Sequence, residues 1–114
     1  KVKKVLLCSG KVYFDLLEKQ QKEGRKDVAI VRVEQLHPFP ATKVKAELAK
    51  YPKAKVYWVQ EEPENMGYWS FVARDFGWKS FEDVIARKKS ASPATGFLKV
   101  HNEEQAALVE RAFS

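Results

Sequence analysis

Residues that stabilise small secreted or metal-binding proteins are scarce in this 114-residue sequence. Its one cysteine, Cys8, cannot form an internal disulfide, and the apolar run 5–8 is typical of a core segment in a reducing compartment. The two histidines, His37 and His101, have no cysteine or histidine partner at ligand spacing. A structural metal site is therefore not expected.

Long apolar runs are also absent. The most extended one, residues 28–33, contains Arg32 and falls far short of the roughly 18 residues of a membrane span. The sequence opens KVKKVLLCSG, with no initiator methionine and no signal-type region. We therefore expect no membrane partner, and we expect the chain to be a fragment of a larger protein.

Charge of one sign is only mildly in excess. The 21 Lys and Arg residues outnumber the 15 Asp and Glu residues, giving a net charge of +6, and both kinds are spread along the sequence. This mixture predicts a solvated surface rather than a basic stripe that binds nucleic acid.

The sequence is rich in material for a core. Hydrophobic residues make up 45% of it, and three Trp, four Tyr and seven Phe are present. That content predicts a single domain spanning residues 1–114. Three short apolar runs, residues 5–8, 28–33 and 56–59, each indicate a strand buried on both faces.

Helical spacing fills the gaps between these runs. Val12, Tyr13, Leu16 and Leu17 predict a helix that Gly24 ends, and Val44, Leu48 and Tyr51 predict another, with Thr42 as candidate N-cap and Pro52 as breaker. Alternating strands and helices predict a parallel sheet with right-handed crossovers.

The second half continues less regularly. Residues 68–72 indicate a helix that fades near Gly77, residues 81–87 a fourth strand, and residues 90–96 a loop. Asn102 is expected to cap a last helix, with Gln105 at the capping-box position. Its apolar face would comprise Leu108, Val109, Ala112 and Phe113.

Ligands of open α/β sheets gather at the carboxyl ends of the strands. Four segments should meet at that edge: residues 9–11, 34–40, 60–63 and 87–90. Ser9-Gly10-Lys11 could hold an anion, but it matches neither the GxGxxG nor the GxxxxGK[ST] pattern. A tight turn in which Gly10 allows close packing and Ser9 caps the helix is the alternative.

The stretch WVQEEPENMGYW, residues 58–69, places Glu61 and Glu62 side by side before Pro63. Adjacent strand residues point to opposite faces, so the two carboxylates are poor candidates for an acid–base pair. They could instead accept backbone N–H bonds at the start of the helix near Gly67, or pair with Arg32. An interface or structural role is therefore expected.

Two other groups of residues have open alternatives. Arg87-Lys88-Lys89, followed by Ser90, Ser92 and Thr95, suits the phosphates of a nucleotide or coenzyme A, and it also fits a basic surface edge. His37 is expected to be packed or hydrogen-bonded, since a catalytic role would require a partner within about 3 Å.

Four stretches together resemble a known family. They are VLLCSGKVYFDL (5–16), DVAIVRVEQLHPFP (27–40), WVQEEPENMGYWSFV (58–72) and SASPATGFLKVHNEEQAALVERAF (90–113). In this order they are similar to the C-terminal domain of the thiamine-diphosphate-dependent first component of the 2-oxoglutarate dehydrogenase complex. The resemblance implies a three-layer α/β/α sandwich like that of transketolase C-terminal domains. Such domains usually add one antiparallel strand, here expected upstream of Lys1.

The resemblance also implies a division of labour in an oxidoreductase of the tricarboxylic acid cycle. Thiamine diphosphate and magnesium would lie in preceding catalytic domains, so this domain alone would hold no cofactor and would be inactive. It would close a homodimer and frame the entrance for the lipoyl arm of the succinyltransferase component. The location would be the bacterial cytoplasm, or the mitochondrial matrix in a eukaryote. Expected interface residues are His37, Phe39, Glu61, Glu62, Trp69 and Phe71.

Actinobacterial members of this family also carry an allosteric acetyl-CoA site. The matching positions are Ser9, Arg25, Lys55, Arg87 and Lys88. The sequence departs from that set at Cys8, where those members should carry a hydroxyl residue. An acyl-CoA or nucleotide-binding regulatory module is therefore the alternative to an assembly domain. An independent flavodoxin-like enzyme would need a phosphate loop richer in Gly, Ser and Thr.

Overall fold

The computed structural model describes residues 2–34, 39–63, 65–87 and 98–114. It contains one four-stranded sheet formed by β1 (Lys4–Cys8), β2 (Val28–Arg32), β3 (Lys55–Pro63) and β4 (Asp83–Arg87). The strand order is β2-β1-β3-β4, and every pair is parallel. The predicted parallel sheet is confirmed. An antiparallel strand upstream of Lys1 stays a prediction.

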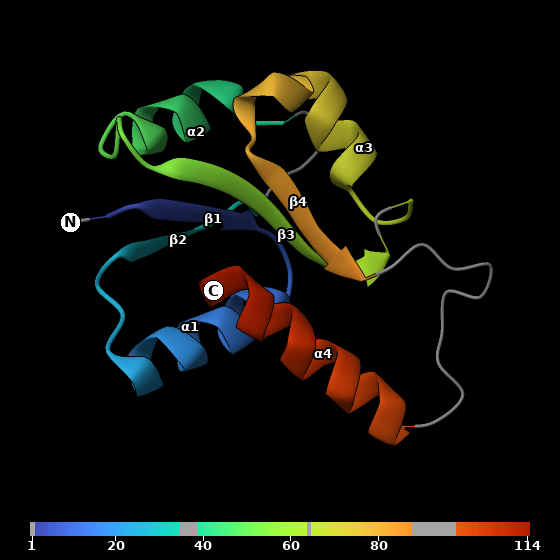
Figure 1. Cartoon of the computed structure of the whole chain (residues 1–114). Helices are drawn as coiled ribbons and strands as arrows, with labels where there is room; N and C mark the ends of the chain where they lie inside the picture. Colours follow the sequence, from blue (N-terminus) through green and yellow to red (C-terminus); the bar gives the residue numbers. More distant parts are fainter. Residues whose placement is uncertain (1, 35–38, 64, 88–97) are drawn as a thin grey trace.

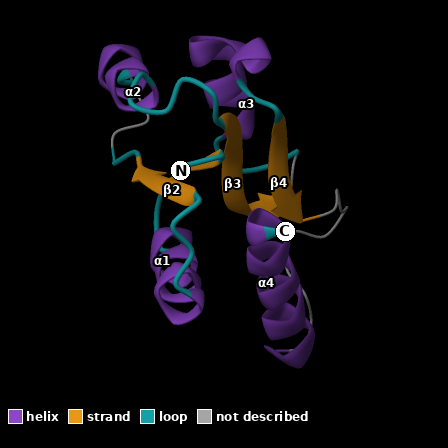
Figure 2. Cartoon of the chain, turned by 60° about the vertical axis from the view of Figure 1, so that its left-hand side comes forward, coloured by secondary structure: helices purple, strands orange, loops and turns teal. Residues whose placement is uncertain are grey.

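Helices cover both faces of the sheet (Figures 1 and 2). On one face lie α1 (Val12–Glu23) and α4 (Leu98–Phe113). On the other lie α2 (Ala41–Leu48) and α3 (Trp69–Val72), the latter followed by a π-helical segment Ala73–Gly77 and a 3-10 turn Trp78–Ser80. The three-layer α/β/α architecture is thus confirmed.

Strand alternation divides the core into two clusters. Leu6 and Cys8 of β1 point to the α1 and α4 side, whereas Val5 and Leu7 point to the α2 and α3 side. The first cluster also contains all four residues predicted for the apolar face of the last helix, which are Leu108, Val109, Ala112 and Phe113. Burial of apolar side chains on both sheet faces explains why the strands read as continuous apolar runs.

The helix starts differ from the sequence expectations. Helix α2 begins at Ala41 after Pro40, so Thr42 lies inside it and does not cap it. Helix α4 begins at Leu98, which places Asn102 within it. Helix α1 follows Lys11 with no side-chain cap, so Ser9 is not its cap. Proline fixes φ near the helical value and is tolerated at a helix start, which permits the earlier start of α2.

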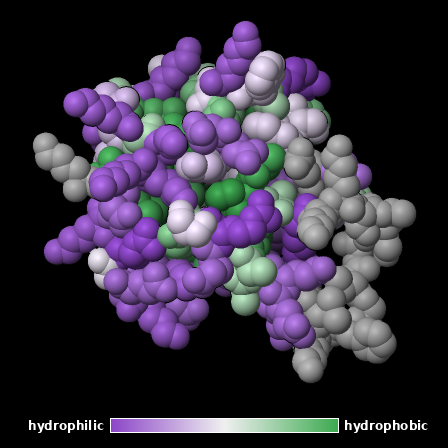
Figure 3. All heavy atoms as spheres, in the orientation of Figure 1, coloured by the Kyte–Doolittle hydropathy of each residue, from purple (hydrophilic) through white to green (hydrophobic). Residues whose placement is uncertain are grey.

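Hydrophilic side chains cover most of the face seen in Figure 3, and apolar atoms show mainly near its middle. Within the described residues, no helix has the length and apolar character needed to cross a membrane.

Candidate functional site

The carboxyl ends of the four strands lie at one edge of the sheet, as expected for parallel strands. The strands end there at Cys8, Arg32, Pro63 and Arg87. After β3, the chain turns into α3 through hydrogen bonds to one buried side chain.

Gln60 is that side chain, and it is 4% exposed. Its Oε1 accepts bonds from Trp58 Nε1 at 2.9 Å and from the Trp69 backbone N–H at 3.0 Å. Its Nε2 donates to the carbonyl oxygens of Pro63 at 2.8 Å, Met66 at 2.7 Å and Glu62 at 3.3 Å. Because both amide atoms are hydrogen-bonded, Gln60 ties the described residues of the turn to β3 and to the start of α3.

Gly67 lies against the same amide. Its φ is +72°, and a Cβ built there would lie 3.0 Å from Glu62 Oε1 and 3.2 Å from Gln60 Nε2. Both the backbone conformation and the close approach favour glycine at this position. The turn could not accept a side chain at Gly67 without moving Glu62 or Gln60.

The turn and α3 present three exposed apolar side chains, which we call the docking face: Met66, Tyr68 and Phe71. They are 39%, 49% and 39% exposed, and the rings of Tyr68 and Phe71 lie 6.4 Å apart. Large apolar side chains gathered on a surface mark interaction sites. Arg74 covers part of this face, with its guanidinium 4.9 Å from the Phe71 ring centre.

Only part of the predicted interface set lies on this face. Phe71 does, but Trp69 is half-buried and packs edge-on against Phe81 at 5.3 Å. Phe39 is buried and contacts the Phe76 ring at 5.2 Å. His37 lies outside the described residues. Phe39 therefore belongs to the core cluster on the α2 and α3 side, and Trp69 packs against it.

Glu61 and Glu62 occupy opposite sides of the sheet, as strand alternation predicted. Glu61 Oε1 accepts a bond from Gln105 Nε2 of α4 at 3.0 Å, whereas Glu62 is exposed beside Gly67 near α3. Two expectations about them are wrong. Gln60, not a glutamate, accepts the backbone N–H at the start of α3. Pairing with Arg32 is prevented because β1 lies between β2 and β3.

A polar cluster lies on the α1 and α4 side of the same edge, centred on Gln105. Its Nε2 also donates to Asp15 Oδ2 at 2.8 Å, and its Oε1 accepts from Arg87 Nη2 at 2.8 Å. Arg87 Nη1 lies 3.3 Å from Glu104 Oε1. The cluster joins α1, β3, β4 and α4, so its residues stabilise the packing of α4.

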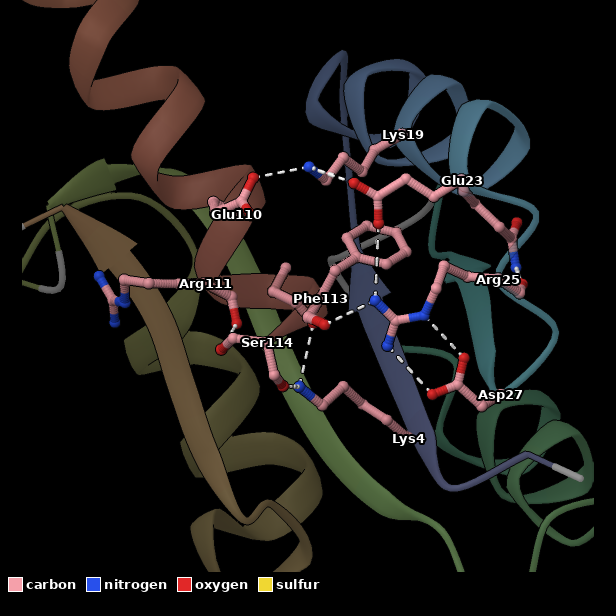
Figure 4. Close-up of polar contacts among 11 residues, drawn as sticks. Lys4, Lys19, Glu23, Arg25, Asp27, Glu110, Arg111, Phe113 and Ser114 are labelled. Carbon is pink, nitrogen blue, oxygen red and sulfur yellow. Dashed lines mark hydrogen bonds and ion pairs between the residues drawn. The ribbon is translucent and has the colours of Figure 1, made fainter.

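The opposite edge of the sheet holds the end of α4 (Figure 4). Lys4 Nζ donates to the carbonyl oxygens of Ala112 at 3.1 Å and Ser114 at 2.7 Å. Arg25 Nη1 donates to the Phe113 carbonyl at 2.8 Å, and its Nε and Nη2 bind both oxygens of Asp27. Cations at the last carbonyls of a helix complement its dipole.

The contact between Arg25 and Asp27 makes the stability of the fold depend on pH in the acidic range. The hydrogen bonds from Arg25 lower the pKa of Asp27 from near 4 to about 2. A lowered carboxyl pKa stabilises the fold above the unfolded-state pKa, and that contribution is lost as the pH falls through the folded-state value. Urea unfolding should therefore show the advantage of the native chain over Asp27→Asn shrinking between pH 4 and pH 2. A difference that stays constant over this range would contradict the assignment.

The predicted acyl-CoA residues divide between the two edges. Ser9 and Arg87 lie at the carboxyl edge, whereas Arg25 and Lys55 lie at the amino ends of β2 and β3. Lys88 lies outside the described residues. A five-residue strand separates the edges by about 13 Å, and Arg25 and Arg87 are engaged within the chain. The structure therefore does not bring the four described residues together in one pocket.

The expectation that thiamine diphosphate and its magnesium lie outside this domain stays a prediction. Residues 2–34, 39–63, 65–87 and 98–114 hold no group of three His, Cys, Asp or Glu side chains that could bind a metal ion. Ser9-Gly10-Lys11 forms the turn between β1 and α1, and anion binding by this turn stays a prediction. No catalytic step is assigned to this chain.

Comparison with known proteins agrees with this architecture. Residues 1–113 match the family described as 2-oxoglutarate dehydrogenase C-terminal. The 2-oxoglutarate dehydrogenase E1 component of Cupriavidus necator is 46% identical over 120 residues, covering 100% of this chain and 12% of that protein. The E1 component of Azotobacter vinelandii is 44% identical, covering 100% of the chain and 13% of the relative. The E1 component of Brucella anthropi is 44% identical, covering 98% of the chain and 12% of that protein.

The chain thus spans about one eighth of the length of these relatives. The family match extends over nearly every residue, and the four-stranded parallel sheet between two helix layers fits the sandwich that the sequence motifs implied. This chain belongs to the family of 2-oxoglutarate dehydrogenase C-terminal domains.

Proposed function

We propose that residues 1–114 form a single C-terminal assembly domain of a 2-oxoglutarate dehydrogenase E1 component. The parent enzyme would oxidatively decarboxylate 2-oxoglutarate and transfer the succinyl group to a lipoyl group. Thiamine diphosphate would supply the chemistry from the catalytic portion of the polypeptide. The bacterial relatives support a cytoplasmic location.

The observation that carries this proposal is the docking face. Met66, Tyr68 and Phe71 are exposed in the isolated chain, although the turn that presents them is fixed by a buried amide. A rigid apolar face is suited to a permanent contact, since little ordering entropy is lost on binding. The relatives are about eight times longer than the chain, so the partner we assign is the catalytic portion of the same E1 polypeptide.

The first test is activity of the separated parts. The isolated chain should show no 2-oxoglutarate-dependent decarboxylation with thiamine diphosphate and magnesium present, because the proposal assigns that cofactor to the catalytic portion of the polypeptide. The full-length E1 polypeptide should be active in the same assay. Turnover by the isolated chain would overturn the assignment of an assembly role.

Homodimer closure and access of the lipoyl arm are further parts of the proposal. Both would place the carboxyl edge of the sheet near a subunit boundary, where Glu62 and the docking face are exposed. Sedimentation of the full-length protein measures whether it forms a homodimer. A full-length monomer at micromolar concentration would count against a role in dimer closure.

A further inference from the structure

Gln60 is a buried polar residue that the proposed assembly role has not yet explained. Burial of an amide is costly unless every donor and acceptor is satisfied. Here two donors reach Oε1 and three carbonyl oxygens surround Nε2, and all five partners belong to β3, the following turn or the start of α3. Such a network specifies one conformation more than it adds stability.

Two members of that network connect directly to the docking face. The Met66 carbonyl accepts from Gln60 Nε2, so the amide fixes the backbone that carries the Met66 side chain. The Trp69 N–H donates to Gln60 Oε1, which fixes the first residue of α3 between Tyr68 and Phe71. Helix α3 has only four residues, too few to hold its own orientation.

We propose that Gln60 is the positioning residue of the docking face. It holds the turn in the conformation that presents Met66, Tyr68 and Phe71 together, and so prepares the face for the catalytic portion of E1. The inference rests on the proposed assembly function. Only an amide serves here, because the site requires a two-hydrogen donor and an acceptor side by side.

The variant Gln60→Glu tests this requirement with almost unchanged shape. Its carboxylate can still accept from Trp58 and Trp69, but it places a negative oxygen against the carbonyls of Pro63 and Met66. At low pH the protonated carboxyl regains one O–H donor. Burial raises the pKa of such a group, so recovery should begin well above the ordinary glutamate range.

The readout is hydroxyl-radical labelling of Met66, Tyr68 and Phe71 in full-length E1. At pH 8, labelling of these three side chains in Gln60→Glu should rise at least threefold over the native protein, and it should fall back toward the native level at pH 5. The native protein, which also carries the neighbouring Glu61 and Glu62, should show no such pH step. Labelling of the native protein at both pH values is therefore the control for titration of Glu61 and Glu62.

Val44→Ala is the matched control for lost stability. Val44 is 3% exposed in the same core cluster as Trp58, and its apolar side chain forms no hydrogen bond with Gln60. Labelling of the docking face should stay at the native level in this variant. Equal labelling in Gln60→Glu and Val44→Ala at pH 8, with both proteins folded, would overturn the proposal.

A second variant covers the case in which Gln60→Glu does not fold. Trp58→Phe keeps an aromatic ring in the core but removes the indole donor to Gln60 Oε1 together with part of the buried ring volume. In this variant, labelling of the docking face should rise by a smaller factor, about 1.5-fold to twofold. Labelling at the level of the native protein would count against the positioning role of Gln60. Strong labelling of the native full-length protein itself would instead refute the assembly function.

Discussion

Replacement of Trp58 by alanine is expected to destabilise the chain by about 4 kcal/mol. Trp58 is 1% exposed and is the largest fully buried side chain among the described residues, packed between the sheet and the α2 and α3 layer. Its removal leaves a large cavity and takes one of the two donors from Gln60 Oε1. A loss of this size is a large fraction of the 5–15 kcal/mol that holds a typical domain together.

The measurement is urea unfolding followed by far-ultraviolet circular dichroism, with a thermal scan in which the midpoint should fall by roughly 15 °C. Trp78→Ala is the matched control. Trp78 is 65% exposed, so the same substitution there should change the unfolding free energy by less than about 0.5 kcal/mol. Equal losses at the two tryptophans would contradict the described packing.

Replacement of Tyr68 and Phe71 by serine is expected to leave the folding of the chain intact while weakening its docking about a hundredfold. Both side chains are exposed, so the unfolding free energy should change little. Two aromatic interface residues together contribute about 3 kcal/mol to a typical contact, and 1.4 kcal/mol corresponds to a factor of ten. Activity of full-length E1 should fall with the docked fraction.

Phe14→Ser is the control for this pair. Phe14 is 54% exposed on α1, in the helix layer on the other side of the sheet, so its loss removes a similar area of aromatic surface. The control should retain the native rate of 2-oxoglutarate decarboxylation and the native resistance to protease. Native behaviour of the Tyr68→Ser, Phe71→Ser protein in both assays would refute the docking face.

The strands and layers could be predicted because each strand is buried on both faces and reads as a continuous apolar run. Residues 5–8 and 56–59 correspond to β1 and to the first part of β3. Gly24 ends α1 as predicted, but the starts of the helices could not be predicted from caps. Candidate caps at Thr42 and Asn102 both lie inside helices that begin earlier. Packing of the apolar face, rather than the cap, set those starts.

The candidate site was predictable in part. The sequence indicated that the polar residues after Trp58 fix the turn by hydrogen bonds. The face of the sheet on which each of these residues lies follows from strand alternation. Gln60 shares the face of Trp58, so it reaches α3, whereas Glu61 reaches Gln105 of α4. The exposure of Phe71 and burial of Trp69 had no sequence signal, because a four-residue helix is too short to show a period.

Contacts between distant residues had no local signal at all. Arg25 and Phe113 are 88 positions apart, and Gln105 and Asp15 are 90 apart, yet each pair forms a hydrogen bond of 2.8 Å. These contacts exist because α1 and α4 pack side by side on one face of the sheet. Arg25 and Arg87, which the family resemblance grouped as acyl-CoA ligands, lie at opposite edges because one precedes β2 and the other ends β4.

The most direct test of the assembly function is hydroxyl-radical labelling of the native protein in two forms. In the isolated chain, Met66, Tyr68, Phe71 and the reference residue Phe14 should all react, since all are exposed. In full-length E1, the docking face should be labelled at least fivefold less, while Phe14 reacts as before. Equal labelling of Met66, Tyr68 and Phe71 in the two forms would contradict the account.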